Sequence, residues 1–177
     1  MNIKDYILVI KDVVPTLLCD DIIKEYKNCN QWDKAPTRGE STHRNCSIIP
    51  MSVQDDDYRR KIDFDVFNCT VKCIETYNNK FEHSTVDEDT GYDLLRYEEG
   101  EYYKQHVDAF LQEPRLISCS LALNDDFKGG EFGFFNNELK YKLNKGDAIM
   151  FPSNFMYPHQ INTVTKGTRY SIITWFR

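Results

Sequence analysis

The sequence lacks both an excess of basic residues and a long apolar run. Its 177 residues carry 22 Lys and Arg against 28 Asp and Glu, which gives a formal net charge of −6. This balance disfavours a nucleic-acid backbone as the main partner, because phosphate binding needs a basic face. No window approaches the roughly 18 apolar residues of a membrane-spanning helix. We therefore expect neither a nucleic-acid partner nor a membrane partner.

The N-terminal segment lacks the features of a secretory signal peptide. Its apolar run, Tyr6 to Ile10, is short and flanked by charged residues, and no small-residue cleavage site follows it. The cysteines lack the C-x-x-C spacing that is typical of metal-binding or redox cysteines. We therefore expect a cytoplasmic protein whose cysteines are free and mostly buried. The six are Cys19, Cys29, Cys46, Cys69, Cys73 and Cys119.

Internal repeats, low-complexity tracts and linkers rich in Pro, Gly or Ser are also missing from the sequence. The length fits one domain, since domains typically run to about 100–200 residues. The residue pattern changes near residue 85, from helical spacing of apolar residues to short strand-like runs. We predict a single domain over residues 1–177, with helical support and a loop in 1–85 and a strand-rich core in 86–177.

The first half carries two helical patterns. Pro15 suits the first turn of a helix, and Leu18, Ile22 and Tyr26 then recur every four residues. A longer helix is predicted after Ser52, where acidic residues complement the positive end of the helix dipole. Its buried face is marked by Ile62, Val66, Cys69, Cys73 and Tyr77.

The second half carries short runs rich in aromatic and β-branched residues, separated by Gly, Asn and Asp clusters. Asn136-Asn137 and the run from Asn144 to Asp147 are predicted as hairpin turns. Eight closely spaced strands favour a jelly roll with N-terminal helices packed on one sheet, rather than alternating βαβ units. The predicted strands are Tyr92–Tyr97, Tyr102–Val107, Leu116–Leu123, Glu131–Phe135, Leu139–Leu143, Ala148–Phe151, Gln160–Val164 and Tyr170–Phe176.

A polar stretch, Asp33 to Cys46, lies between the two predicted helices. It contains Pro36 and Gly39, and we interpret it as a long loop. Long loops in compact domains are often functional. With Lys34, Arg38 and Arg44, this loop could close over an extended substrate, although an ordinary surface loop explains the same residues.

A candidate metal site begins with His106 and Asp108 at the end of a predicted strand. Residues i and i+2 of a strand point to the same face, so the two side chains can chelate one metal ion. The motif alone is weak, because the chain has four histidines and 17 aspartates.

Two later residues strengthen the interpretation. His159 stands at the start of a later strand, and Arg169 follows ten residues on. Alone, His159 would be interpreted as a structural or surface residue and Arg169 as a solvated charge. Together with His106 and Asp108 they form two histidines and one carboxylate on a barrel face. This is the donor set of the facial triad in non-haem Fe(II) oxygenases.

Residues from about Tyr92 to Phe176 resemble the catalytic core of iron(II)- and 2-oxoglutarate-dependent dioxygenases, in the prolyl 4-hydroxylase-like branch. The matching blocks are ordered along about half of the chain, which is more specific than any one motif. They are LLRYEEGEYYKQHVDAF, PRLISCSLALNDDFKGGEFGF, KGDAIMFPS, His159 and GTRYSIITWF.

The resemblance implies that His106, Asp108 and His159 bind Fe(II). It implies that Arg169 pairs with the distal carboxylate of 2-oxoglutarate, which suits the fork of a guanidinium better than an ammonium. Ser171, on the same strand face, would add a hydroxyl hydrogen bond.

The resemblance also implies lesser contacts to the co-substrate. Tyr97 would donate its phenol, Tyr103 would lie near the metal end, and Trp175 would form a wall. Core packing explains these aromatic residues as well. Many relatives carry a tyrosine that helps hold the distal carboxylate, whereas this chain has Ala122 in the corresponding strand. That help must come from elsewhere.

The function implied is an enzyme that hydroxylates a prolyl residue in a protein or peptide with Fe(II), 2-oxoglutarate and O2, releasing succinate and CO2. Ascorbate is expected to support its activity. Two alternatives remain open: hydroxylation of another side chain or a free small molecule, and a non-catalytic jelly-roll module that binds metal or 2-oxoglutarate. The sequence leaves the oligomeric state open.

Overall fold

The structure is a computed structural model that describes residues 2–37, 42–51, 56–112 and 114–177. Most of its elements are short strands. In chain order they are η1 (Ile3–Tyr6), β1 (Leu8–Ile10), α1 (Thr16–Tyr26), β2 (Asp33–Lys34), β3 (Arg44–Asn45), β4 (Ser47–Pro50), α2 (Asp57–Lys80), β5 (Asp93–Tyr97), β6 (Tyr102–His106), β7 (Ile117–Ala122), β8 (Lys128–Gly129), β9 (Phe132–Phe134), β10 (Leu139–Tyr141), β11 (Ala148–Pro152), β12 (His159–Ile161), β13 (Val164–Lys166) and β14 (Arg169–Phe176).

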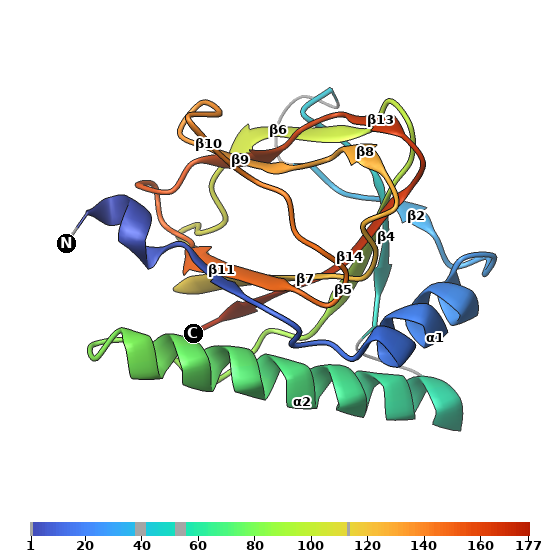
Figure 1. Ribbon diagram of the computed structural model, residues 1–177, viewed down its shortest axis with the longest axis horizontal. Coiled ribbons are helices and arrows are strands. Elements are labelled where there is room, and N and C mark those ends of the chain that lie inside the picture. Colours follow the sequence, from blue (N-terminus) through green and yellow to red (C-terminus); the bar gives the residue numbers. More distant parts are fainter. Residues whose placement is uncertain (1, 38–41, 52–55, 113) are drawn as a thin grey trace.

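Two sheets form the body of the molecule. The larger has seven strands in the order β1-β11-β7-β14-β5-β4-β2, and the second has five in the order β10-β9-β12-β6-β3. Every pair of neighbouring strands in these sheets is antiparallel. Figure 1 shows the second sheet above the first, with α2 running below the first. This is the jelly-roll core with helices on one sheet that the sequence predicted.

The long helix α2 forms where the periodic pattern indicated. Asp56 caps its N-terminus, because the carboxylate accepts hydrogen bonds from the backbone N–H groups of Tyr58 and Arg59. Its buried face includes all five predicted residues, Ile62, Val66, Cys69, Cys73 and Tyr77. The predicted acidic cap includes Asp55, which lies outside the described residues.

The outer core lies between the helices and the larger sheet. α1 contributes Cys19, Ile22 and Tyr26, all fully buried. These side chains pack with the buried face of α2 and with the outward-facing residues of β7 and β14, including Leu121 and Ile172. Burial of such side chains contributes about 1.5–3 kcal/mol each. The packing of the helices therefore stabilises the outer face of the larger sheet.

The inner core lies between the two sheets. Alternate residues of each strand point inward. Phe132, Phe134 and Phe151 fill one end of the interior, and Leu95 and Ile161 extend this cluster. The polar residues of the interior adjoin this cluster, since the His159 ring packs against Phe134 and Phe151, and they carry the site described below.

The N-terminal half supplies strands as well as helices. β1 extends the larger sheet beside β11, β4 pairs with β5, and β3 pairs with β6. The sequence analysis predicted none of these, because runs of two to four residues give no detectable alternation. The predicted loop over residues 33–46 is therefore anchored at both ends by strands. Its residues 38–41, Arg38 among them, lie outside the described residues.

Several boundaries differ from the prediction. The predicted strand over residues 160–164 is two strands, β12 and β13, which belong to different sheets. Asn136 and Asn137 have positive φ angles and connect β9 to β10, as predicted. The run from Asn144 to Asp147 does form a tight turn, closed by a 3.0 Å backbone hydrogen bond. It is not a hairpin, because β10 and β11 lie in different sheets.

All six cysteines are free thiols, and five of them are buried. This matches the expectation from their spacing. In the described part of the chain, α1 and α2 are both too short or too polar to cross a lipid bilayer.

Candidate metal centre and its pocket

Three polar side chains from two strand ends converge in the interior, beside the phenylalanine cluster. His106 ends β6 and His159 begins β12, and these two residues are direct partners in the antiparallel pair. Asp108 follows two residues after His106. One ligand atom from each of the three residues lies within 4.8 Å of the others. The sequence-predicted triad is thus brought together as a cluster that can hold a metal ion.

Backbone carbonyls orient both imidazoles. Nδ1 of His106 lies 2.9 Å from the Lys104 carbonyl, and Nδ1 of His159 lies 3.1 Å from the Tyr157 carbonyl. A carbonyl oxygen only accepts, so each Nδ1 carries the proton and donates. Both Nε2 atoms then present lone pairs toward Asp108, at 3.4 Å and 3.5 Å from its carboxylate oxygens. This tautomer is the one that metal-binding imidazoles adopt.

The protonation states of the cluster suit a cation. Burial lowers the pKa of His159 to about 4, so its imidazole is neutral at pH 7. Burial alone would raise the pKa of the Asp108 carboxyl, but His159, His106 and the Ser118 hydroxyl together hold that pKa well below its ordinary value. Metal ions bind neutral imidazole and ionised carboxylate. The cluster needs no further deprotonation of these two groups to take up a metal ion.

Two serines hold the Asp108 carboxylate in place. The Ser118 hydroxyl donates to Oδ2 of Asp108 at 2.7 Å and lies 2.8 Å from the Ser153 hydroxyl. The Ser153 carbonyl also accepts the backbone N–H groups of Asp108 and Ala109. The sequence analysis did not identify either serine, since neither belongs to a motif that names a chemical role. Such outer groups fix the orientation of metal ligands.

The triad opens into a cavity of about 430 Å³ between the two sheets. This volume lies within the usual range for small-molecule sites. Its lining combines apolar residues such as Phe132 and Phe151 with the triad and three arginines, Arg44, Arg115 and Arg169.

Arg169 is a buried cation at the far side of this cavity. Only 4% of the residue is exposed, and Nη1 donates to the Ser171 hydroxyl at 2.8 Å. Burial lowers the pKa of Arg169, with partial compensation from Tyr97 and Cys46. Among the described residues no carboxylate lies within ion-pair distance of Arg169. A buried charge is costly unless it is paired, so this guanidinium is suited to an anionic ligand.

The other predicted pocket residues also line the cavity. The Tyr97 hydroxyl is buried beside the Cys46 thiol, with no partner other than this thiol among the described residues, and burial raises its pKa. Tyr103 stacks on His106 with ring centroids 3.5 Å apart, and Trp175 packs under the guanidinium of Arg115 at 3.5 Å. All three lie where a pocket role requires, and whether they contact a ligand remains a prediction.

Comparison with known proteins gives the family of this half of the chain. Residues 92–177 match the family model described as the 2OG-Fe(II) oxygenase superfamily. Residues 92–177 belong to that superfamily. Its name implies Fe(II) and 2-oxoglutarate.

Sequence relatives of this oxygenase domain are PKHD-type hydroxylases of bacteria. One from Idiomarina loihiensis is 37% identical over 88 residues, which cover 46% of this chain and 39% of the relative. One from Acaryochloris marina is 41% identical over 86 residues, or 45% of this chain and 38% of the relative. The match therefore spans well under half the length of these curated relatives.

Solved structures show that the fold extends beyond the oxygenase domain's sequence match. A prolyl hydroxylase of Trichoplax adhaerens, in complex with a hypoxia inducible factor peptide, has a TM-score of 0.81 and 16% identity over 97% of this chain and 83% of its own. A prolyl-4-hydroxylase of Pseudomonas putida has a TM-score of 0.75 and 18% identity, with 97% and 92% covered. The fold is that of the prolyl 4-hydroxylase-like branch.

The residues present fit the two groups that the superfamily name implies. The His106–Asp108–His159 cluster offers neutral imidazole and carboxylate donors, which suit non-haem iron. The guanidinium of Arg169, which has no carboxylate partner among the described residues, offers a site for a carboxylate, and the buried Tyr97 hydroxyl lies in the same cavity.

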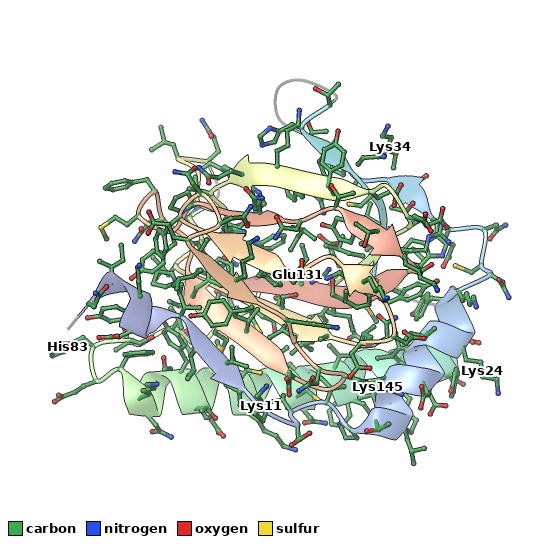
Figure 2. All side chains as sticks on the ribbon, turned by 45° about the horizontal axis from the view of Figure 1, so that its top comes forward. Lys11, Lys24, Lys34, His83, Glu131 and Lys145 are labelled. Carbon is green, nitrogen blue, oxygen red and sulfur yellow. The ribbon has the colours of Figure 1, made fainter. Side chains whose placement is uncertain are left out.

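Outside the triad, the remaining histidines and basic residues differ in exposure. Figure 2 shows His83 and Lys34 at the periphery of the molecule, and both are exposed. His43 is half-buried against Tyr103 and lines the cavity. Arg44, which the sequence analysis placed on an open loop, is only 7% exposed. The correction follows from β3, which pairs with β6 and brings Arg44 against the pocket.

Proposed function

We propose that this chain is a 2-oxoglutarate- and Fe(II)-dependent hydroxylase that acts on a prolyl residue of a protein or peptide, over one domain formed by residues 1–177. The observation that carries the proposal is that one cavity contains both a His-Asp-His cluster and the buried guanidinium of Arg169, which has no carboxylate partner among the described residues. The superfamily of residues 92–177 supports the chemistry, and prolyl hydroxylases of the same fold support the target.

In this proposal His106, Asp108 and His159 hold Fe(II), and Arg169 holds the distal carboxylate of 2-oxoglutarate. When bound with O2, these groups would supply oxidative decarboxylation of 2-oxoglutarate, in which one oxygen atom of O2 enters succinate as CO2 is released and the other is inserted into a C–H bond of the substrate. Ser118 and Ser153 keep the Asp108 carboxylate oriented. The phenylalanines of the inner core exclude water from the cavity's deep end.

The substrate would enter from the side lined by Arg44, Arg115 and Trp175. The Arg44 guanidinium lies 4.6 Å over the Tyr103 ring, and its Nη2 has no hydrogen-bond partner among the described residues. A buried donor of this kind suits a carbonyl or carboxylate oxygen of a substrate. The stretch over residues 33–46, which carries Arg44, would then contact a bound peptide.

The single experiment that tests the proposal measures succinate formed from 2-oxoglutarate with Fe(II), O2 and ascorbate, with and without proline-rich peptides. We expect a peptide to stimulate succinate formation and to gain one oxygen atom on a proline, detected by mass spectrometry. His106→Ala and Asp108→Ala are expected to abolish the iron-dependent turnover. Ascorbate is expected to raise the yield.

Other outcomes would decide between the alternatives. Succinate formation that no peptide stimulates would favour a different side chain or a free small molecule as substrate. Normal metal binding without any turnover would favour a non-catalytic binding module. Retained activity in Asp108→Ala would contradict the assignment of the metal site.

The free state of all six cysteines fits the expected cytoplasmic location.

A further inference from the structure

The inner face of the larger sheet forms a ladder of side chains between Arg169 and the metal cluster. Strand register sets its order: Ala122 pairs with Ser171, Ser120 pairs with Ile173, and Ser118 pairs with Trp175. Residues two apart on a strand share a face and are separated by about 6.8 Å. The serines at 171, 120 and 118 therefore follow one another along the cavity wall.

The two ends of this ladder have partners. Ser171 accepts the hydrogen bond from Arg169, and Ser118 donates to Asp108. Ser120 in the middle has none: its hydroxyl is buried, and no partner is found for it among the described residues. Ser120 is 3% exposed and lines the cavity.

An unpartnered buried hydroxyl is expensive. Leaving such a group unsatisfied costs about 1–3 kcal/mol, and nearly all buried polar groups in folded proteins are paired. The cross-strand neighbours of Ser120 are apolar, because Ser120 lies between Ile149 and Ile173 in the sheet. Valine or alanine would fit such surroundings, so a hydroxyl here needs an explanation.

We propose that Ser120 is a co-substrate-binding residue whose hydroxyl hydrogen-bonds to an oxygen of bound 2-oxoglutarate. A five-carbon dicarboxylate is about as long as two residues of extended chain, about 7 Å. Lying between the guanidinium of Arg169 and the metal cluster, such a ligand passes Ser120. The inference rests on the use of 2-oxoglutarate in the proposed function, but not on the identity of the hydroxylated substrate.

The absence of a polar group at Ala122 also supports a contact from Ser120. It stands beside Ser171 on the neighbouring strand, where its methyl group offers no hydrogen bond. Ser120 is the next residue of β7 on the same face. A hydroxyl at Ser120 therefore supplies, one step nearer the metal, the polar contact that β7 lacks at Ala122.

The same sheet provides a matched control. The Thr174 hydroxyl is also buried without a partner in the described part of the chain. Thr174 lies one residue from Ile173 on β14, so its side chain points to the opposite face, away from the cavity. If Ser120 were only a structural residue, the Ser120 and Thr174 variants would behave alike.

The test measures binding of 2-oxoglutarate by isothermal titration calorimetry to the full chain loaded with Fe(II), with oxygen and peptide excluded so that no turnover occurs. The variants are Ser120→Ala, Ser120→Cys and Thr174→Val. We expect Ser120→Ala to raise the Kd for 2-oxoglutarate about 10-fold, the loss of one hydrogen bond to a charged acceptor. Ser120→Cys keeps the shape of the side chain with a slightly larger atom, but the thiol is a weak donor, so this variant should lose a similar factor. Thr174→Val should bind as the wild type does.

A thermal-shift measurement accompanies the titration. Without ligand, Ser120→Ala is expected to melt at or above the wild-type temperature, because an unsatisfied hydroxyl is removed. With 2-oxoglutarate, its gain in melting temperature should be smaller than that of the wild type. An unchanged Kd in Ser120→Ala, with wild-type binding intact, overturns the inference alone. Failure of the iron-loaded wild type to bind 2-oxoglutarate overturns both the inference and the proposed function.

Discussion

The Ser118 hydroxyl donates a 2.7 Å hydrogen bond to Oδ2 of Asp108 and thereby fixes one of the three candidate metal ligands. Ser118 lies on β7 of the larger sheet, whereas both histidines belong to the second sheet. The carboxylate is thus oriented from the opposite side of the interior. This arrangement makes the geometry of the metal centre depend on the spacing of the two sheets.

Ser118→Ala should weaken metal binding about 10–100-fold, the usual effect of removing an outer hydrogen bond to a metal ligand. The carboxylate would remain present but would lose its fixed orientation. Ser153→Ala, which leaves the bond between Ser118 and Asp108 in place, should have a smaller effect. Titration of the chain with Fe(II) or Mn(II) measures the affinity. Equal affinity in Ser118→Ala and the wild type would contradict a positioning role.

Arg169→Lys should weaken 2-oxoglutarate binding at least 10-fold while metal affinity stays near the wild-type value. Lysine keeps the positive charge but loses the planar fork that matches a carboxylate. It also loses the bond that Arg169 makes to Ser171. Parallel titrations with metal alone and with 2-oxoglutarate separate these effects. A variant that binds 2-oxoglutarate normally would show that the distal carboxylate lies elsewhere.

Arg44→Met should raise the KM for a peptide substrate and leave the Kd for 2-oxoglutarate unchanged. Methionine keeps much of the apolar contact with Tyr103 but removes the Nη2 donor, which has no hydrogen-bond partner among the described residues. A hydrogen bond from a charged donor contributes about 1.5–3 kcal/mol, so the KM should rise about 10-fold or more. Lys34→Met, an exposed change on β2 in the same stretch, serves as the control.

The metal-free chain should lose stability as the pH falls from about 6.5 to about 4. His159 in the folded chain has a pKa of about 4, whereas its unperturbed value is 6.5. Between these values the unfolded chain binds a proton that the folded chain does not, so acid favours unfolding. The full shift corresponds to about 3 kcal/mol of unfolding free energy. The Asp108 contribution is lost only below about pH 4, because the pKa of that carboxyl is lowered in the folded chain.

Urea unfolding in the presence of a chelator, repeated across this range, measures the effect. In His159→Gln the slope between pH 6.5 and 4 should be smaller by about one proton. Identical slopes in the two proteins would show that His159 titrates normally when folded.

The parts of the fold that the sequence predicted are those with a local signal. The apolar stripes at Ile22 and at Val66 repeat over two or more turns, and the helices appear where the spacing indicated. β2 and β3 carry two residues each, so their pairing depends on strands far along the chain and leaves no local pattern. The same cause misplaced Arg44, whose burial is decided by its neighbour β6.

The candidate site divides in the same way. The histidines and Asp108 were found because their spacing and chemistry are distinctive. Ser118, Ser120 and Ser153 were missed, because a single serine in a strand is common and its function comes from a partner in three dimensions. Ser118 and Ser153 are 35 positions apart in sequence but share a 2.8 Å hydrogen bond. These three serines are distinguished by their burial and by the presence or absence of a hydrogen-bond partner, neither of which the residue type alone shows.

The pairing of His106 with His159 has a consequence for the lifetime of the protein. A metal ion held by Asp108 and His159 would join positions 51 residues apart in sequence, and its binding would stabilise the folded chain alone, because the site is lost on unfolding. The six cysteines provide no disulfide bond for that purpose. Iron would then act as a removable cross-link of the folded chain, and it would stabilise the fold by an amount that rises with the logarithm of the free iron concentration. Scarcity of iron would leave more of the chain open to proteolysis, so that the amount of protein would follow the metal.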